Sequence, residues 1–187
     1  MTSSARSRFV LLWTLTVLVL LADQASKYGM FAWLAQEGDH YVVIPGFFKL
    51  IHNRLNEGAV FGMGNTFGGS ANLFFAGFSL LALGFIVYWS MQREVKESWW
   101  LAACLGLIAG GALGNLYDRL VFKGVRDFLW IHNERGPDWT HFNFAVFNFA
   151  DTCLVTGAIM LLLHTFFVPR TVDKSVEAGS APIPTQD

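Results

Sequence analysis

The sequence predicts an all-α membrane protein with four transmembrane helices and a small extracytoplasmic β-cradle. Of its 187 residues, 53% are hydrophobic and only 14% are charged, whereas a soluble domain carries about 25% charged residues. Four apolar segments are each long enough to cross a bilayer, which requires about 20 residues. The net charge of −1 argues against a nucleic-acid partner, because such binding depends on a basic surface.

The first predicted span starts at Phe9 and continues past Asp23 and Lys27 to about Trp33. Two arginines before an apolar stretch are also typical of a cleaved signal peptide. However, no Ala-x-Ala cleavage site follows at the right distance, and a charged residue interrupts the segment where cleavage would fall. We therefore expect a helix that is retained.

Three further spans follow; the second is uncharged, the third is uncharged up to residue 117 and includes Asp118 where it extends further, and the last contains Asp151. They cover residues 71–91, residues 99–117 with an extension to residue 122, and about 145–168. Gly106, Gly110, Gly111 and Gly114 punctuate the third span with GxxxG spacing, which lets another helix approach closely. We favour this packing role over the alternative, a small face that leaves room for a lipid or peptide.

Four spans place both termini on the same side of the membrane. Basic residues occur in the N-terminal segment, the loop between the second and third spans and the C-terminal tail, so the positive-inside tendency assigns these regions to the cytoplasm. We expect one domain over residues 1–168 and a disordered cytoplasmic tail over residues 169–187, which is polar. The outer segments are then about 34–70 and 123–144.

The first outer segment contains two predicted strands, residues 41–44 and 47–52, around the turn Pro45-Gly46. Strands beside the membrane could hold an extended peptide by adding it as another strand. The alternative is a structural hairpin on the bilayer surface, and the sequence does not distinguish the two.

Two aspartates stand out, because an ionisable group near or within hydrocarbon costs several kcal/mol and is by default functional. Asp127 lies just beyond the third span, and Asp151 lies near the start of the fourth. Two facing carboxylates can share one proton, and an aspartyl protease uses this arrangement to activate water. By depth alone, Asp118 is as good a partner for Asp151 as Asp127 is.

Other charged residues are predicted at the same depth, near the outer surface. Asp23 and Lys27 are four residues apart on one helix and can pair. We favour a structural ion pair that ties the first helix to the outer segment over a direct catalytic role. For Asp118 and Arg119, an interfacial cap on the third helix and a functional role are equally supported, since a guanidinium can bridge carboxylates or hold a carbonyl or phosphate.

Other chemistries find little support in the sequence. The histidines are scattered without metal-ligand spacing, and no CxxC, HExxH or Gly-x-Ser-x-Gly motif occurs. We interpret Cys104 and Cys153 as small buried hydrophobes and His164 as a packed core histidine. No metal and no organic cofactor are expected.

Five motifs, in this order and on these spans, resemble the lipoprotein signal peptidases (signal peptidase II), the bacterial inner-membrane aspartyl proteases. The resemblance covers most of the chain. Residues 23–27 are similar to the family's DQxxK element, 56–61 to NxGAxF, 111–119 to GGxxGNxxDR, 125–128 to VxDF and 147–151 to FNxAD.

The resemblance implies an activity: removal of the signal peptide from prolipoproteins whose lipobox cysteine already carries diacylglycerol, with cleavage before that cysteine. It also implies that Asp127, rather than Asp118, is the catalytic partner of Asp151. The substrate-binding positions that it implies are Asn56, Gly58, Asn115, Arg119 and Asn148. The supporting positions are Asp23, Lys27 and Asp118. Membrane lipids and globomycin-like inhibitors are implied ligands, and the bacterial inner membrane is the implied location, with the site near the outer surface.

One segment departs from the family: the stretch 131–144 is longer and more polar than the corresponding stretch in typical members. We interpret it as a candidate lid over the site. Three other functions fit the sequence less well. A small transporter or channel would spread polar residues through both leaflets, a presenilin-type protease would carry a GxGD element, and a lipid-binding or assembly protein would leave the paired carboxylates unexplained.

Overall fold

The computed structural model describes residues 3–58, 70–133, 135, 137 and 140–167. Its helices are α1 (Ser3–Trp33), α3 (Ser70–Ser90), α4 (Arg93–Glu97), α5 (Trp99–Val121) and α6 (Phe149–Phe167), and its strands are β1 (His40–Ile44), β2 (Phe48–Ile51), β3 (Leu129–Asn133) and β4 (Phe142–Asn143). Helices α1, α3, α5 and α6 are long and apolar enough to cross a membrane, which confirms the four predicted spans. The predicted tail, 169–187, and residues 59–61 of the second motif lie outside the described residues.

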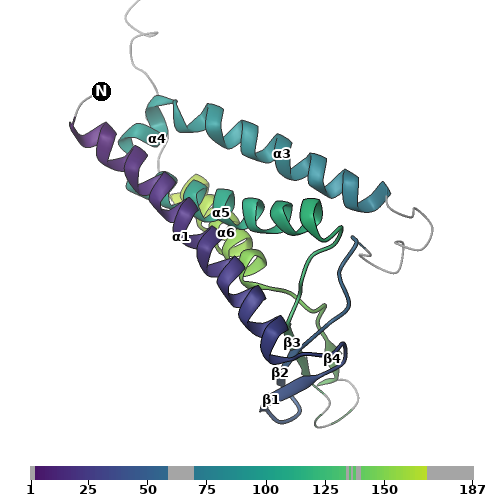
Figure 1. The fold of residues 1–187 in the computed structure, drawn as a ribbon. Helices are drawn as coiled ribbons and strands as arrows, with labels where there is room; N and C mark the ends of the chain where they lie inside the picture. Colours follow the sequence, from purple (N-terminus) through teal and green to yellow (C-terminus); the bar gives the residue numbers. More distant parts are fainter. Residues whose placement is uncertain (1–2, 59–69, 134, 136, 138–139, 168–187) are drawn as a thin grey trace, which may run out of the picture.

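Helix α5 is the centre of the bundle. It packs against α1, α3 and α6 (Figure 1). Its span is 67% buried, whereas the spans of α1, α3 and α6 are 22%, 17% and 17% buried. The outer three helices therefore turn apolar side chains such as Leu81 and Phe166 outward, as expected where the surrounding solvent is lipid.

Glycines allow α5 to approach its neighbours closely. A Cβ atom added at Gly106 or at Gly110 would lie 2.8 Å from a carbonyl oxygen of α1, and one added at Gly111 would lie 2.6 Å from a carbonyl oxygen of α6. These separations are shorter than ordinary contacts, so no larger side chain fits. The predicted packing role is confirmed, and the alternative of a vacant face for a lipid is wrong at these positions.

Four short antiparallel strands form one sheet, in the order β1-β2-β3-β4, at one end of the bundle (Figure 1). The predicted hairpin is confirmed: β1 and β2 flank the turn at Pro45-Gly46, where Gly46 has a φ of 70°. Phe48 of β2 pairs with Ile131 of β3. The sheet therefore joins the two segments that the sequence predicts on the outer side.

The described part of the polar stretch 131–144 extends this sheet. His132 of β3 pairs with Asn143 of β4, and the side chain of Arg135 packs over Gly46 at the β1–β2 turn. The backbone of these residues is therefore engaged in a hairpin that extends the sheet, and the lid over the site stays a prediction.

The start of α6 also differs from the prediction. The helix begins at Phe149 rather than near residue 145, because Phe147 is held in an antiparallel bridge: its N–H donates to the Leu129 carbonyl at 3.0 Å and its carbonyl accepts from the Leu129 N–H at 2.8 Å. The loop after α3 contains the short helix α4, which was not predicted. Ser98 then caps α5 by accepting a hydrogen bond from the Leu101 N–H at 3.2 Å.

The buried charged side chains lie toward one end of the bundle. The starts of α1 and α5 and the end of α6 gather at the end away from the sheet, where Arg8 donates to the Lys96 carbonyl at 2.9 Å and Trp100 donates to the Met160 carbonyl at 2.8 Å. The buried charged side chains of the described residues lie toward the sheet. They are Asp23, Lys27, Asp118, Arg126 and Asp127. The clustering predicted from span depth is therefore present.

Candidate active site

Two aspartates meet at the sheet end of the bundle, and one asparagine bridges them. Asp127 follows α5, and Asp151 lies in the first turn of α6. The side-chain Nδ2 of Asn148 donates to Asp127 Oδ1 at 2.7 Å. The backbone N–H of Asn148 donates to Asp151 Oδ2 at 3.1 Å. The structure thus brings together the two aspartates that the motif order selected.

The start of α6 orients Asp151. Asn148 immediately precedes the helix, and its Oδ1 accepts a hydrogen bond from the Asp151 N–H at 3.0 Å, while the Asp151 carboxylate accepts from the Asn148 N–H. This reciprocal pair is a capping box. Asn148 is therefore the N-cap of α6 and lies just outside the helix, although the predicted span of about 145–168 includes it. Asn115 Nδ2 donates to Asp151 Oδ1 at 2.7 Å, and the carboxylate stays half-buried.

Amide side chains hold both oxygens of Asp127, which is only 2% exposed. Asn56 Nδ2 donates to Asp127 Oδ2 at 2.9 Å, on the side opposite Asn148. Asn56 is held in turn by Gly58, whose N–H donates to Asn56 Oδ1 at 3.0 Å. Gly58 has a φ of 103°, a conformation that favours glycine. In this structure, Asn56 and Gly58 thus support Asp127.

The pKa of the Asp127 carboxyl is raised from 3.8 to about 7, mainly because burial disfavours its charged form. The negative charge of Asp151 also raises this pKa, whereas the hydrogen bonds from Asn56 and Asn148 and the charge of Lys27 lower it. A carboxyl that exchanges its proton near neutral pH is suited to a pair of acids that share one proton.

Behind the two aspartates, Lys27 joins α1 to α5 through a buried ion network. Its Nζ lies 2.8 Å from Asp23 Oδ2 and 3.3 Å from Asp118 Oδ2, and it donates to Asn115 Oδ1 at 3.0 Å. Asp23 also accepts the Ala150 N–H of α6 at 3.0 Å. The predicted Asp23–Lys27 ion pair is present, but it ties α1 to α5 and α6 rather than to the outer segment.

Asp118 and Arg119 contact different parts of the structure. Asp118 is fully buried, and its partners are Lys27 and Arg126, so its contacts are those of a structural residue. Arg119 is half-buried, and its Nη1 donates to Asn72 Oδ1 on α3 at 3.4 Å. The Arg119 guanidinium also lies 5.0 Å from the ring centre of Phe75. Its contacts therefore link α5 to α3.

Two residues outside the predicted site, Arg126 and Gln24, complete the network. Arg126 donates to Asp118 through Nε at 3.2 Å and through Nη2 at 2.8 Å. Gln24 donates to Asp118 Oδ1 at 3.3 Å, and its Oε1 accepts from Arg126 Nη2 at 2.8 Å. The available signal was their place inside motifs: Gln24 follows Asp23 in the first, and Arg126 precedes Asp127 in the fourth.

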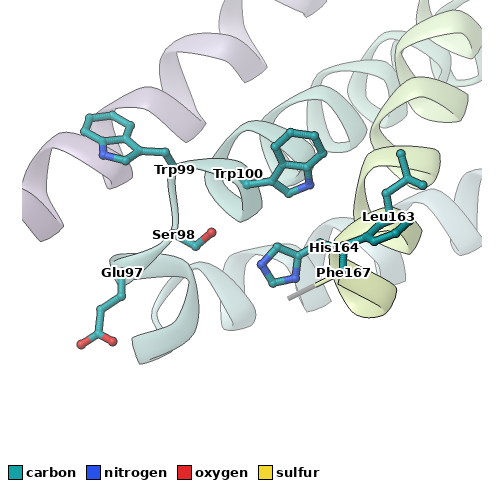
Figure 2. A pocket seen from close by; sticks show the side chains of 7 residues that line it. All are labelled: Glu97, Ser98, Trp99, Trp100, Leu163, His164 and Phe167. Carbon is teal, nitrogen blue, oxygen red and sulfur yellow. The ribbon is translucent and has the colours of Figure 1, made fainter. Parts of the chain in front are cut away.

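A separate hollow of about 620 Å³ lies at the opposite end of the bundle. Its wall comes from the α4–α5 junction and from the end of α6, and includes Trp100 and His164 (Figure 2). His164 is half-buried there, so its prediction as a packed core histidine is wrong.

Cys104 and Cys153 are buried free thiols, as predicted. Within the described ranges, no group of three His, Cys, Asp or Glu side chains is arranged as a metal site.

Known proteins are similar to this chain over most of its length. The family model described as signal peptidase (SPase) II matches residues 15–167. A lipoprotein signal peptidase of Rhodopirellula baltica is 40% identical over 173 residues, covering 86% of this chain and 73% of the relative. A lipoprotein signal peptidase of Pseudomonas fluorescens is 38% identical over 170 residues, covering 90% of this chain and 95% of the relative. A solved structure of a bacterial membrane enzyme matches with a TM-score of 0.67 and 28% identity, covering 83% of this chain and 92% of that one.

Proposed function

The chain belongs to the signal peptidase II family, the membrane proteases that remove signal peptides from prolipoproteins, and we propose that it does so as an aspartic endopeptidase with Asp127 and Asp151 as its catalytic pair. The observation that carries the proposal is the bridge through Asn148, which donates hydrogen bonds to both carboxylates. Two carboxylates in such different environments are suited to divide the roles of general acid and general base.

Asp151 is the better candidate for the base. Its carboxylate is half-buried, so water can reach it, and it accepts charge-stabilising hydrogen bonds from Asn115 and Asn148. In the proposed reaction it takes a proton from water, and the water oxygen attacks the scissile carbonyl carbon. Asp127, buried and protonated, donates to the carbonyl oxygen. When the C–N bond breaks, the leaving amine receives the proton that Asp151 took, and one hydroxyl of the tetrahedral intermediate returns a proton to Asp127, so that a carboxylic acid and an amine leave and both aspartates regain their starting states.

The remaining predicted binding residues divide into two groups. Asn56, Asn115 and Asn148 already donate to the aspartates, so we assign them to the support of the catalytic pair, with Gly58 behind Asn56. Among the hydrogen bonds between described residues, that of the Arg119 guanidinium to Asn72 Oδ1 is long, at 3.4 Å. Its planar fork is therefore the best candidate to hold a substrate carbonyl or a lipid phosphate.

The proposed substrate is a prolipoprotein whose lipobox cysteine carries diacylglycerol, with cleavage just before that cysteine. Its acyl chains, membrane lipids and globomycin-like inhibitors would occupy the apolar surface beside the site. We place the enzyme in the bacterial cytoplasmic membrane as one domain, residues 1–168, with both termini cytoplasmic and the sheet outside. Arg93 and Lys96 in the loop opposite the sheet support this orientation. The buried charges gather at one end of the bundle, which favours this function over a transporter.

The test is precursor processing in cells that depend on this protein. Asp127→Asn and Asp151→Asn should each accumulate lipidated precursor, seen as a mobility shift on a gel, at normal protein level. Asp39→Asn changes an exposed carboxylate and should process normally. Full processing by either of the first two variants would refute the pair. Loss of processing by Asp118→Asn, together with activity in Asp127→Asn, would move the pair to Asp118.

A further inference from the structure

We propose that Arg126 is a positioning residue for the reaction: clamped to Asp118, it holds the adjacent backbone so that the Asp127 carboxyl faces Asp151. The inference rests on the proposed catalytic role of Asp127. Asp127 and Arg126 are adjacent in the sequence but contact different sets of residues. The Asp127 side chain contacts Asn56 and Asn148. The Arg126 side chain contacts Asp118 and Gln24. Arg126 thus anchors the chain from the side away from the reaction.

Three donors of Arg126 converge on one carboxylate. Its backbone N–H lies 3.0 Å and its Nε lies 3.2 Å from Asp118 Oδ2, and its Nη2 lies 2.8 Å from Asp118 Oδ1. Two parallel guanidinium contacts of this kind fix orientation as well as distance. Arg126 is only 4% exposed and Asp118 is fully buried, so water does not compete with the clamp.

Aromatic rings also hold the guanidinium. Its central carbon lies 4.2 Å from the ring centre of Tyr28 and 4.2 Å from that of Phe122. A planar guanidinium can stack its face on aromatic rings while its edge donates two hydrogen bonds to a carboxylate. An ammonium group cannot make both interactions at once. The site therefore selects arginine, and lysine would keep the charge but lose the geometry.

The clamp acts where the backbone has few other ties. On one side of Arg126, Val125 pairs with Asn56 through two backbone hydrogen bonds of 2.8 and 2.9 Å. On the other side, the Phe128 N–H donates to the Phe147 carbonyl at 3.0 Å. Between these anchors, the contacts of Arg126 set the direction of the peptide that carries Asp127. A shift of about 1 Å at a reacting group can cost about 100-fold in rate.

The experiment measures cleavage of a lipidated precursor peptide by purified enzyme, with thermal stability measured on the same samples. Arg126→Lys should remain folded, keep KM within twofold and lose at least tenfold in kcat; Arg126→Gln should lose more. Lys123→Gln, at an exposed cation of the same connection, should keep the kcat of the parent. A merely structural Arg126 would lower the unfolding temperature but leave the kcat of the folded fraction unchanged, and an unchanged kcat in Arg126→Lys would overturn the proposal.

A double variant tests whether Arg126 acts through Asp118. If both residues belong to one clamp, Asp118→Asn combined with Arg126→Gln should be no slower than Asp118→Asn alone. Rate losses that multiply would refute the shared clamp. Asp127→Asn in the same assay separates the two proposals. Activity in Asp127→Asn defeats the catalytic pair itself, whereas an inactive Asp127→Asn beside a fully active Arg126→Lys defeats only the positioning role.

Discussion

Replacing Asp127 by asparagine should abolish cleavage and yet stabilise the protein at alkaline pH. The side chain is 2% exposed and its pKa is raised from 3.8 to about 7. A carboxyl with a raised pKa favours the protonated form in the folded state. Its contribution to stability is therefore full below pH 4 and is lost as the pH rises through about 7. Asparagine has no charge to lose, so it escapes this penalty.

The size of the effect follows from the shift in pKa. One pKa unit corresponds to about 1.4 kcal/mol, so the penalty for burying the ionised Asp127 carboxyl reaches about 4 kcal/mol at pH 8, while at pH 4 it stays below about 1 kcal/mol. Asparagine accepts one fewer hydrogen bond from the flanking amides, which costs about 1 kcal/mol at every pH. Comparing the two pH values removes that constant cost.

The assay is thermal or denaturant unfolding of the detergent-solubilised protein, followed by tryptophan fluorescence between pH 4 and pH 8. The free energy of unfolding of Asp127→Asn minus that of the parent should rise by about 4 kcal/mol over this range. The exposed Asp39→Asn serves as the control and should show little change. A difference for Asp127→Asn that stays flat with pH would refute the claim that burial shifts the titration of this carboxyl.

Three further substitutions test other parts of the account. Gly114→Ala should lower the free energy of unfolding by about 1–3 kcal/mol in thermal unfolding, because the added Cβ would collide with a buried carboxylate of α1. Gly84 faces open space, so Gly84→Ala should leave the stability unchanged or raise it. Equal losses of stability in the two variants would contradict the close packing. Lys27→Met should cost about 3–5 kcal/mol, because it removes the ion-pair partner of the buried Asp23 carboxylate, while Arg93→Met at an exposed pair should not change stability measurably. Asn148→Ala should lower kcat about 100-fold and stability by about 1 kcal/mol; normal kcat would remove the bridge from the mechanism.

Features set by local sequence were predictable. The span predicted at 71–91 is the helix Ser70–Ser90, because length and apolar content alone decide whether a segment suits a bilayer. The Asp23–Lys27 pair follows from spacing on one helix. The predicted depth in the membrane could not identify Asp127 as the partner of Asp151, because Asp118 is predicted at a similar depth. The resemblance to a family was needed to select Asp127 over Asp118.

Features set by distant contacts were not predictable in this way. The strand Leu129–Asn133 is defined by its pairing with Phe48–Ile51, and its polar residues suggested a lid instead. Asn148 precedes α6 because the bridge at Phe147 ends the extended segment there. Arg126 was not predicted as a site residue, because its partners lie on α1 and α5 and nothing in its own segment shows them.

The most direct test of the catalytic pair is single-turnover cleavage of a diacylglyceryl-modified precursor by purified enzyme. Asp127→Asn and Asp151→Asn should each bind the precursor with near-normal affinity and cleave it at least 1,000-fold more slowly than the parent, on the order of what loss of a general acid or base costs. Cleavage by either variant within about tenfold of the parental rate would contradict this expectation, because neither carboxyl could then be the group that activates water or protonates the scissile carbonyl.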